Sequence, residues 1–218
     1  MNSWLSNNYL EIFGAVTGII YVFLEIRQTI WLWPLGLVTS AIYVWIFFTS
    51  KLYADMSLQA YYVVISVLGW YWWFFGARFR EKGRRRDGEM GRSGEGEKTE
   101  LVVTHLRLKT GVILFIVFIV LFFIMWLVLS RLTDSPVPGL DAFLTSLSII
   151  ATWMLARKIY EHWFLWVVVN LVSVFLYFTR GLYPTVILYF VYLIMSFIGL
   201  IAWRNSLISE IQISIKDI

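Results

Sequence analysis

A block of twelve residues occurs twice in this chain: YVVISVLGWYWW at residues 62–73 returns as YLIMSFIGLIAW at residues 192–203. The first tyrosine, the serine, the glycine and the last tryptophan keep their places at an offset of 130. Further pairs at this offset, with no gap, are Glu11 with Asp141, Trp33 with Trp163, and Leu52-Tyr53 with Leu182-Tyr183. An offset that is kept this far along a chain predicts two copies of one structural unit.

The composition is that of a membrane protein. Hydrophobic residues occupy 60% of the 218 positions and charged residues only 15%, whereas a soluble domain has about 45–50% and about 25%. Residues 111–129 contain no charged side chain, and a helix needs about 20 apolar residues to cross a bilayer. The sequence therefore predicts an all-α integral membrane protein. Its lack of cysteine excludes disulfides and thiolate metal sites.

Hydropathy, with breaks at charges, glycine and proline, predicts seven transmembrane helices. They lie near residues 9–26, 31–49, 56–76, 108–130, 141–157, 162–179 and 184–204. The fourth returns the chain to its starting side, so the two three-helix repeats are predicted to be parallel (3+1+3, SWEET-like). The predicted parts are a first repeat at 1–76, a basic cytoplasmic loop at 77–107, a linker helix at 108–130, a second repeat at 141–204 and a cytoplasmic tail at 205–218. Such duplications are typical of transporters, whose substrate site lies between the repeats.

The distribution of basic residues predicts the orientation. Ten of the 18 lysines and arginines lie between Arg78 and Lys109, which predicts that this segment is cytoplasmic. The N-terminus is then external and the C-terminus cytoplasmic, with 15 basic residues inside and three outside. The Gly, Arg and Glu mixture at 83–98 favours a flexible linker. Binding of anionic lipid or nucleic acid by Arg84-Arg85-Arg86 is the alternative, and we expect no nucleic-acid partner.

The titratable residues do not predict an enzyme. His105 lies in the basic loop, and His162 begins a predicted helix beside Glu161 with no third ligand near it in the sequence. We expect a solvated or interfacial pair there, no metal site, no catalytic residue and no cofactor. Glu11, Glu25, Asp55, Asp141 and Glu161 all fall at or near predicted helix ends, where water reaches them. Glu11 and Asp141 suit helix capping, with ion coupling as the alternative. Because no charged residue lies deep in a predicted span, we expect substrate movement that is not coupled to an ion gradient.

Neutral polar and aromatic residues inside the predicted spans form the candidate substrate site. They are Thr39, Ser40, Gln59, Tyr62, Ser66, Trp163, Trp166, Asn170 and Tyr192. Trp163, Trp166 and Asn170 share one helical face, since steps of three and four residues stay on one side. An asparagine within a bilayer needs a polar partner, so it should face the bundle. Such faces can enclose an aromatic, hydrogen-bonding ligand, and helix packing or an interfacial tryptophan belt is the alternative.

Motifs in both halves point to a known family. They are Phe47-Phe48, Lys51-Leu52-Tyr53-Ala54-Asp55, Leu58-Gln59 and Gly69-Trp70, then Arg157-Lys158, Glu161, Trp163-x-x-Trp166-x-x-x-Asn170 and Gly181-Leu182-Tyr183. On these residues the chain resembles the PnuC family of bacterial vitamin transporters, over all but the hydrophilic loop and the C-terminal tail. The resemblance implies a SWEET-like homotrimer in the bacterial inner membrane. It also implies facilitated diffusion of unphosphorylated nicotinamide riboside, trapped by a cytosolic kinase, with substrate contacts from Trp163, Trp166, Asn170 and Gln59.

Two positions depart from this pattern. Members that resemble the nicotinamide riboside type carry asparagine where this chain has Thr39 and Ser66. Two amide groups that can orient a ligand are therefore missing. Residues 54–62 are similar to the thiamine-leaning branch, so uptake of thiamine, or of riboflavin, is the alternative. A membrane scaffold or signalling protein that uses its basic loop is the alternative of a different class.

Overall fold

The computed structural model describes residues 9–49, 53–86, 102–133 and 136–216, which form seven α-helices and their connections. The helices are α2 (Tyr9–Ile26), α3 (Leu32–Thr49), α4 (Tyr53–Arg86), α5 (Leu108–Leu132), α6 (Pro138–Ala156), α7 (His162–Thr179) and α8 (Tyr183–Lys216). Each starts within three residues of the start predicted from hydropathy. The prediction of an all-helical chain is thus confirmed.

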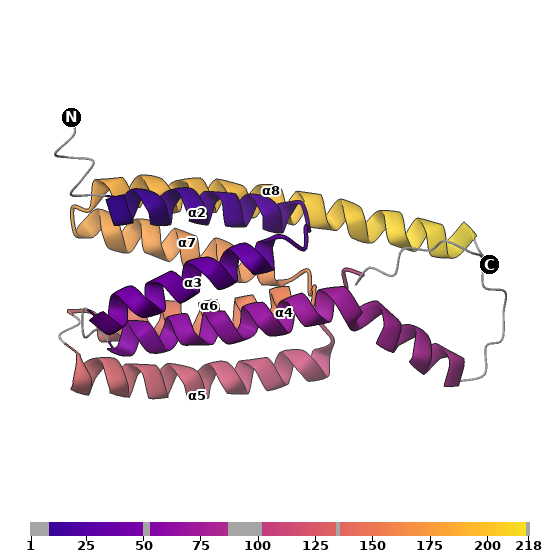
Figure 1. Cartoon of the computed structure of the whole chain (residues 1–218), viewed down its shortest axis with the longest axis horizontal. Helices are drawn as coiled ribbons and strands as arrows, with labels where there is room; N and C mark the ends of the chain where they lie inside the picture. The colour runs from indigo at the N-terminus through magenta and orange to yellow at the C-terminus, as the bar shows by residue number, and fades with distance from the viewer. Residues whose placement is uncertain (1–8, 50–52, 87–101, 134–135, 217–218) are drawn as a thin grey trace.

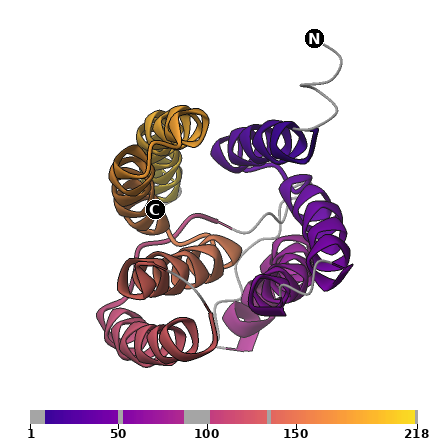
Figure 2. The ribbon, with the colours of Figure 1, turned by 90° about the vertical axis from the view of Figure 1, so that its left-hand side faces the viewer.

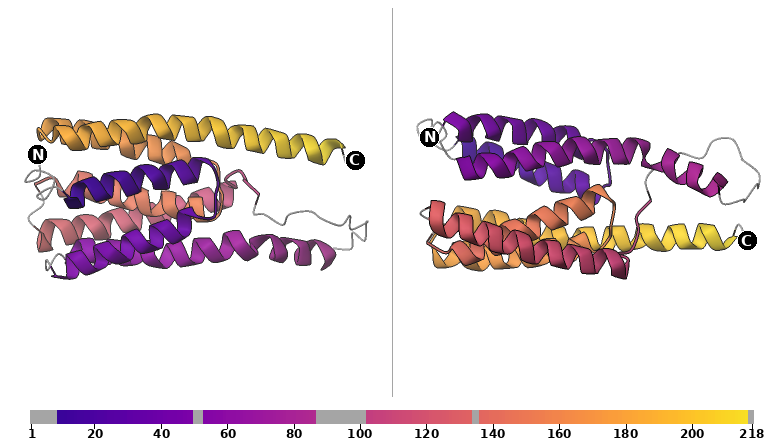
Figure 3. Two further views of the ribbon diagram at one scale, coloured as in Figure 1. Left: turned by 45° about the horizontal axis from the view of Figure 1, so that its top comes forward. Right: turned by 90° about the horizontal axis from the view of Figure 1, so that it is seen from below.

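Two helices are longer than predicted. α4 continues past residue 76 to Arg86, and α8 continues past residue 204 to Lys216. Parts of the expected loop at 77–107 and of the expected tail at 205–218 are therefore helical. Arginine, lysine and glutamate are good helix formers even where the chain is too polar to stay inside a bilayer. Both extensions project from the same end of the bundle (Figures 1 and 3).

The helices run side by side along the long axis of the molecule (Figure 1). Viewed along that axis, α2, α3, α4, α6, α7 and α8 follow one another around a ring, and α5 lies outside it against α6 (Figure 2). The ends of the described chain lie at opposite ends of the bundle, because α2 begins at one end and α8 finishes at the other. We call α2 to α4 the first half and α6 to α8 the second half.

Among the residues that the structure describes, five helical segments are long and apolar enough to cross a membrane: α3, α5, α6, α7 and residues 183–208 of α8. α2 contains a shorter apolar stretch, Phe13–Ile26, and lies beside them. α5 is the most apolar, and it has no buried residue. A helix that is hydrophobic on all sides and unburied by protein is suited to contact with lipid. The chain is therefore a multi-pass membrane protein.

Packing inside the two halves is repeated at the offset of 130. The ring of Trp33 lies against Gly69, and the ring of Trp163 lies against Gly199, so closely that a methyl group at either glycine would overlap the indole. The rings of Trp33 and Trp73 meet edge to face with their centroids 5.5 Å apart, and those of Trp163 and Trp203 do so with their centroids 5.9 Å apart. This close approach explains why both positions are glycine.

The turns that follow α2 and α6 also match. Gln28 and Lys158, which are 130 residues apart, have φ values of 54° and 49°. Their backbone nitrogens donate to Glu25 O at 3.0 Å and to Leu155 O at 2.9 Å. Two non-glycine residues in this sparsely populated region, at equivalent positions, indicate one inherited backbone conformation.

Each half packs its first helix against the last helix of the other half. Gln28 Nε2 donates to Ser206 Oγ at 3.0 Å, which ties the end of α2 to α8. The ammonium of Lys158 lies 4.4 Å from the ring of Trp73, which ties the end of α6 to α4. Tyr61 also donates to Ile149 O at 2.8 Å. One core cluster contains Trp33 and Trp73 from the first half together with Trp163 and Trp203 from the second.

A short extended segment before α5 lies across the turn between α6 and α7. Thr104 N donates to Lys158 O and Tyr160 N donates to Thr104 O, both at 2.9 Å. Val103 is buried in the central core cluster. The segment 102–107 is therefore part of the packed end of the bundle where α4 and α8 project.

Candidate functional site

A short chain of hydrogen bonds links α7 to α8 in the second half. Asn170 is 5% exposed, and its Nδ2 donates to Ser196 Oγ at 3.0 Å. Ser196 Oγ donates in turn to Tyr192 O at 2.8 Å. Helical steps of four residues place Tyr192 and Ser196 on one face of α8. Three of the predicted site residues or their repeat partners are thus brought together, and an asparagine inside the bilayer has the polar partner that it needs.

Two tryptophans stand on the same helix. Trp166 is half-buried and packs against the central core cluster. Trp163 is 1% exposed, so its ring is enclosed by protein and fits the packing alternative as well as the binding one. The Nε1 atoms of both residues are buried without a hydrogen-bond partner in the described structure. Buried donors of this kind are uncommon and call for an explanation.

The first half supplies the other predicted residues. Ser66 is 4% exposed and lies beside Gly36 of α3, and Tyr62 packs against the same core cluster as Trp166. Thr39 and Gln59 are half-buried, on α3 and α4. Among the described residues, neither of these two joins the Asn170 chain of hydrogen bonds. The structure thus brings Tyr62 to the shared core and shows Thr39 and Gln59 half-buried on neighbouring helices.

Tyr192 connects the polar chain to the first half. A methyl group added to Gly18 of α2 would overlap the Tyr192 hydroxyl. Its ring also meets that of Tyr189 at 5.8 Å, and Tyr189 stacks on Tyr177 at 5.1 Å. Aromatic rings and neutral polar groups therefore converge between α2, α7 and α8. Such a surface suits a planar ligand that forms hydrogen bonds, because aromatic faces can stack on a neutral ring or on a cationic one.

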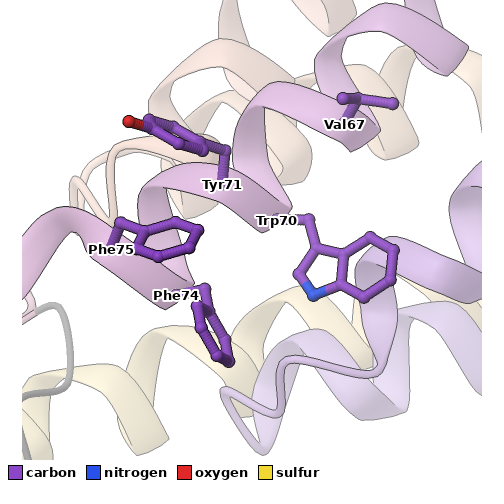
Figure 4. A pocket seen from close by; sticks show the side chains of 5 residues that line it. All are labelled: Val67, Trp70, Tyr71, Phe74 and Phe75. Atoms are coloured by element: carbon purple, nitrogen blue, oxygen red, sulfur yellow. The ribbon is translucent and has the colours of Figure 1, made fainter.

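An apolar hollow of about 300 Å³ lies elsewhere, on the outer face of α4. Figure 4 shows its lining, which comes entirely from one helix: Val67, Trp70, Tyr71, Phe74 and Phe75. Apart from one hydroxyl and one indole N–H, these side chains are hydrocarbon, whereas substrate sites add several convergent polar groups. None of the predicted site residues lines this hollow, and we assign no substrate to it.

Two expectations about titratable residues were wrong. Glu25 is not reached by water: it is 2% exposed, and its Oε1 lies 3.1 Å from Nε2 of His162, which is 0% exposed. His162 therefore pairs with α2 and not with its neighbour Glu161. Glu161 contacts His105 at 2.9 Å and accepts a hydrogen bond from Leu106 N at 2.8 Å. The sequence places Glu25 beside a helix end but cannot show that α7 and α8 cover that end.

A signal for this pair does exist in the sequence. At the offset of 130, Glu25 corresponds to Leu155 and His162 corresponds to Leu32. Two polar residues thus stand opposite two leucines in halves whose core tryptophans and glycines match. Among the described residues, no group of three or more His, Cys, Asp or Glu side chains can hold a metal ion.

These features are those of a transporter of small solutes. The chain is a multi-pass helical membrane protein with an internal duplication, and its interior is neutral, aromatic and able to form hydrogen bonds. Residues 8–205 match the family model described as nicotinamide mononucleotide transporter. The chain therefore belongs to this family, which is one of transporters and not of enzymes.

Individual relatives agree with this assignment and confirm the resemblance to PnuC. The nicotinamide riboside transporter PnuC of Escherichia coli is 23% identical, over 91% of this chain and 86% of the relative. That of Neisseria mucosa is 28% identical, over 94% and 73%. The riboflavin/roseoflavin transporter RibM of Streptomyces davaonensis is 24% identical, over 78% and 73%.

A solved structure shares the fold. The crystal structure of the vitamin B3 transporter PnuC superposes with a TM-score of 0.65 at 24% identity, over 93% of this chain and 83% of that chain. The helical arrangement described above is therefore one that an experimentally determined transporter adopts.

Proposed function

We propose that this protein moves an unphosphorylated vitamin, nicotinamide riboside, across the membrane by facilitated diffusion, and that a cytosolic kinase traps the product by phosphorylation. The observation that carries the proposal is the hydrogen-bonded, uncharged group of Asn170, Ser196 and Tyr192, together with the unpartnered Nε1 donors of Trp163 and Trp166 on the same helix as Asn170. A nicotinamide ring can stack on indole, and ribose hydroxyls can accept and donate hydrogen bonds.

The charges near this group favour the nucleoside over the nucleotide that the family description names. Among the described residues, the buried side chains that can carry positive charge are Lys158 and His162, both at the end of the bundle. Phosphate recognition requires arginine, lysine or several converging N–H groups. We therefore expect the phosphorylated vitamin to bind far more weakly.

The proposed membrane arrangement is seven crossings in two parallel three-helix repeats, with α5 as the linker. The matching turns at Gln28 and Lys158 and the matching tryptophan–glycine contacts support the duplication. We place the N-terminus outside, the C-terminus in the cytoplasm, and a homotrimer in the bacterial inner membrane. A reporter fused after Ile218 should be active only as a cytoplasmic reporter, and a periplasmic signal would show that a crossing was miscounted.

Thiamine or a flavin is the alternative substrate on the same fold. Thr39 and Ser66 stand where the nicotinamide riboside type carries asparagine, and a riboflavin/roseoflavin transporter is among the relatives. Replacing amide groups by shorter hydroxyls changes which ligand edge can be paired. The substrate thus depends on the few polar side chains that face the ligand.

A binding screen tests the proposal. Purified protein is titrated by calorimetry with nicotinamide riboside, thiamine, riboflavin and the phosphate of each. We expect nicotinamide riboside to bind and its phosphate to bind at least about a hundredfold more weakly, about 2.7 kcal/mol. Tight binding of thiamine or riboflavin, without binding of nicotinamide riboside, would show that the proposed substrate is wrong and would leave the proposed transport function in place. Binding of none of them, with function lost when the basic loop is removed, would favour the scaffold alternative.

A further inference from the structure

Outside the candidate site, one corner of the bundle buries two titratable side chains together. We call Glu25, His162 and Trp203 the Glu25 corner. The carboxylate and the imidazole are 3.1 Å apart, and Trp203 Nε1 donates to Glu25 O at 3.1 Å. The rings of His162 and Trp203 are 4.6 Å apart. Ionisable groups buried within a membrane protein are costly and are usually retained for function.

The hydrogen bonds fix the number of protons on the pair. His162 Nδ1 lies 2.7 Å from Ile159 O, and a carbonyl only accepts, so Nδ1 carries a proton. The contact between Nε2 and Glu25 Oε1 needs a second proton, which sits on one atom or the other. Either way the pair is neutral overall. Without that second proton, the corner would bury a net negative charge, which is strongly unfavourable.

Other charged groups around the corner have their own contacts. Three cations lie over aromatic rings: Arg27 over Phe23, Arg157 over Trp72 and Lys158 over Trp73. Glu161 contacts His105, and Arg204 of α8 is exposed. The neutral phenol of Tyr21 of α2 interacts electrostatically with Glu25. The described residues of α3 and α4 in this core cluster, among them Leu32 and Trp73, are uncharged. The proton on Glu25 and His162 is thus the variable charge of this corner.

We propose that Glu25 and His162 form a proton-binding site that holds α2 against α7, and that the proton is exchanged with water each time this end of the bundle opens. The proposal deepens the proposed function and rests on it for the transport step. No covalent bond changes: the proton moves from the pair to water and returns from water when the end closes.

The direction of the pH effect follows from proton counts. In water a carboxyl group is ionised above about pH 4.3, and an imidazole loses its second proton above about pH 6.5. Above that pH the open pair holds one proton fewer than the closed pair. Raising the pH therefore favours opening, by up to about tenfold per pH unit. Because the proton is released to and taken up from the same side of the membrane, no proton crosses with the vitamin. The vitamin concentration therefore still only equilibrates across the membrane.

The equivalent corner of the bundle supplies a matched control. Leu155 and Leu32, which occupy the positions equivalent to Glu25 and His162, are both 0% exposed in the central core cluster. The double variant E25L/H162L copies that corner and removes the titration. The variant E25Q offers a second test, because its amide can donate to Nε2 of a neutral imidazole without holding an exchangeable charge.

Transport is measured as exchange of radiolabelled nicotinamide riboside across proteoliposomes with equal pH on both sides. Between about pH 6.5 and about pH 8.5 we expect the wild-type rate to rise about tenfold, and the rates of E25L/H162L and E25Q to change less than about twofold. Equal pH profiles for the wild type and both variants would overturn the proposal.

Thermal unfolding without vitamin separates this proposal from the proposed function. The folded pair keeps a proton that the unfolded pair loses above about pH 6.5, so the wild type should lose stability relative to E25L/H162L as the pH rises. A difference in stability between wild type and E25L/H162L that does not change with pH would mean that the pair holds no such proton. If the wild type exchanges no nicotinamide riboside at any pH, the proposed function is wrong, while the unfolding result still decides the proton site.

Discussion

The Glu25 corner and its counterpart at the offset of 130 each join the two halves at equivalent places, but they hold the bundle together by different means. At the counterpart, which we call the Leu155 corner, Leu155, Leu32 and Trp73 are buried, and Trp73 Nε1 has no hydrogen-bond partner in the described structure. At the Glu25 corner, Trp203 Nε1 donates to Glu25 O, and the two leucines are replaced by an acid and a histidine. The tryptophans and glycines behind both corners pack alike.

The comparison separates what the fold needs from what has been added at one corner. Two leucines stand in place of the acid and the histidine at the Leu155 corner, where the buried Lys158 ammonium lies over the Trp73 ring, so a Glu–His pair is not required for packing at this place. A buried ion pair is seldom more stable than hydrophobic residues of similar volume. The polar pair must therefore be explained by something other than stability, and exchange of a proton is the explanation we propose.

The largest effect is expected from breaking the polar pair on one side only. H162L leaves Glu25 buried without its partner and should lower the free energy of unfolding by about 3–5 kcal/mol. E25L/H162L should recover most of that loss, because it recreates the leucine pair of the other corner. Denaturant titration in detergent measures both. A double variant no more stable than H162L would show that the two corners are not equivalent.

The next largest effect concerns packing that the two halves share. G69A and G199A should each cost about 1–3 kcal/mol, because the added methyl group overlaps the ring of Trp33 or Trp163. G139A is the control, since a methyl group there meets no atom within 4 Å. Its stability should stay within about 0.5 kcal/mol of wild type. A large loss at one glycine and none at the other would contradict a duplicated packing unit.

A smaller effect is expected on ligand affinity when candidate site residues of the second half are replaced. W166A and N170A should each weaken nicotinamide riboside binding by about 1–3 kcal/mol, through lost stacking and unpaired polar groups. W45A is the control, because it removes a tryptophan that is 69% exposed and lies outside the candidate site. This variant should bind as wild type does. Full affinity in folded W166A and N170A would remove these residues from the site.

The sequence predicted the helices well because their signals are local. Apolar runs that are bounded by charges, glycine or proline place every helix start within three residues of the observed one, and the fixed offset reveals the duplication. The same reasoning ended α4 and α8 too early, because a hydropathy limit marks where a helix leaves the bilayer and not where its hydrogen bonding stops.

The site was predicted only in part because its contacts join distant segments. Asn170 and Ser196 lie on consecutive helices, and their polar character alone indicates a shared interior. Glu25 and His162 are 137 residues apart and meet only when the first half closes on the second. Position near a helix end indicated access to water for both residues, whereas the packing of α8 against α2 and the contact between the two side chains exclude it.

The central claim is that the protein lets a vitamin equilibrate across the membrane without coupling to an ion gradient. It is tested most directly by measuring labelled nicotinamide riboside inside proteoliposomes that contain no kinase, with and without imposed proton and sodium gradients. We predict that the internal concentration rises to the external one and stops there under every gradient. Enclosing the cognate kinase and ATP should then produce net uptake as the phosphate. Accumulation above the external concentration without kinase, abolished by an ionophore, would contradict the claim.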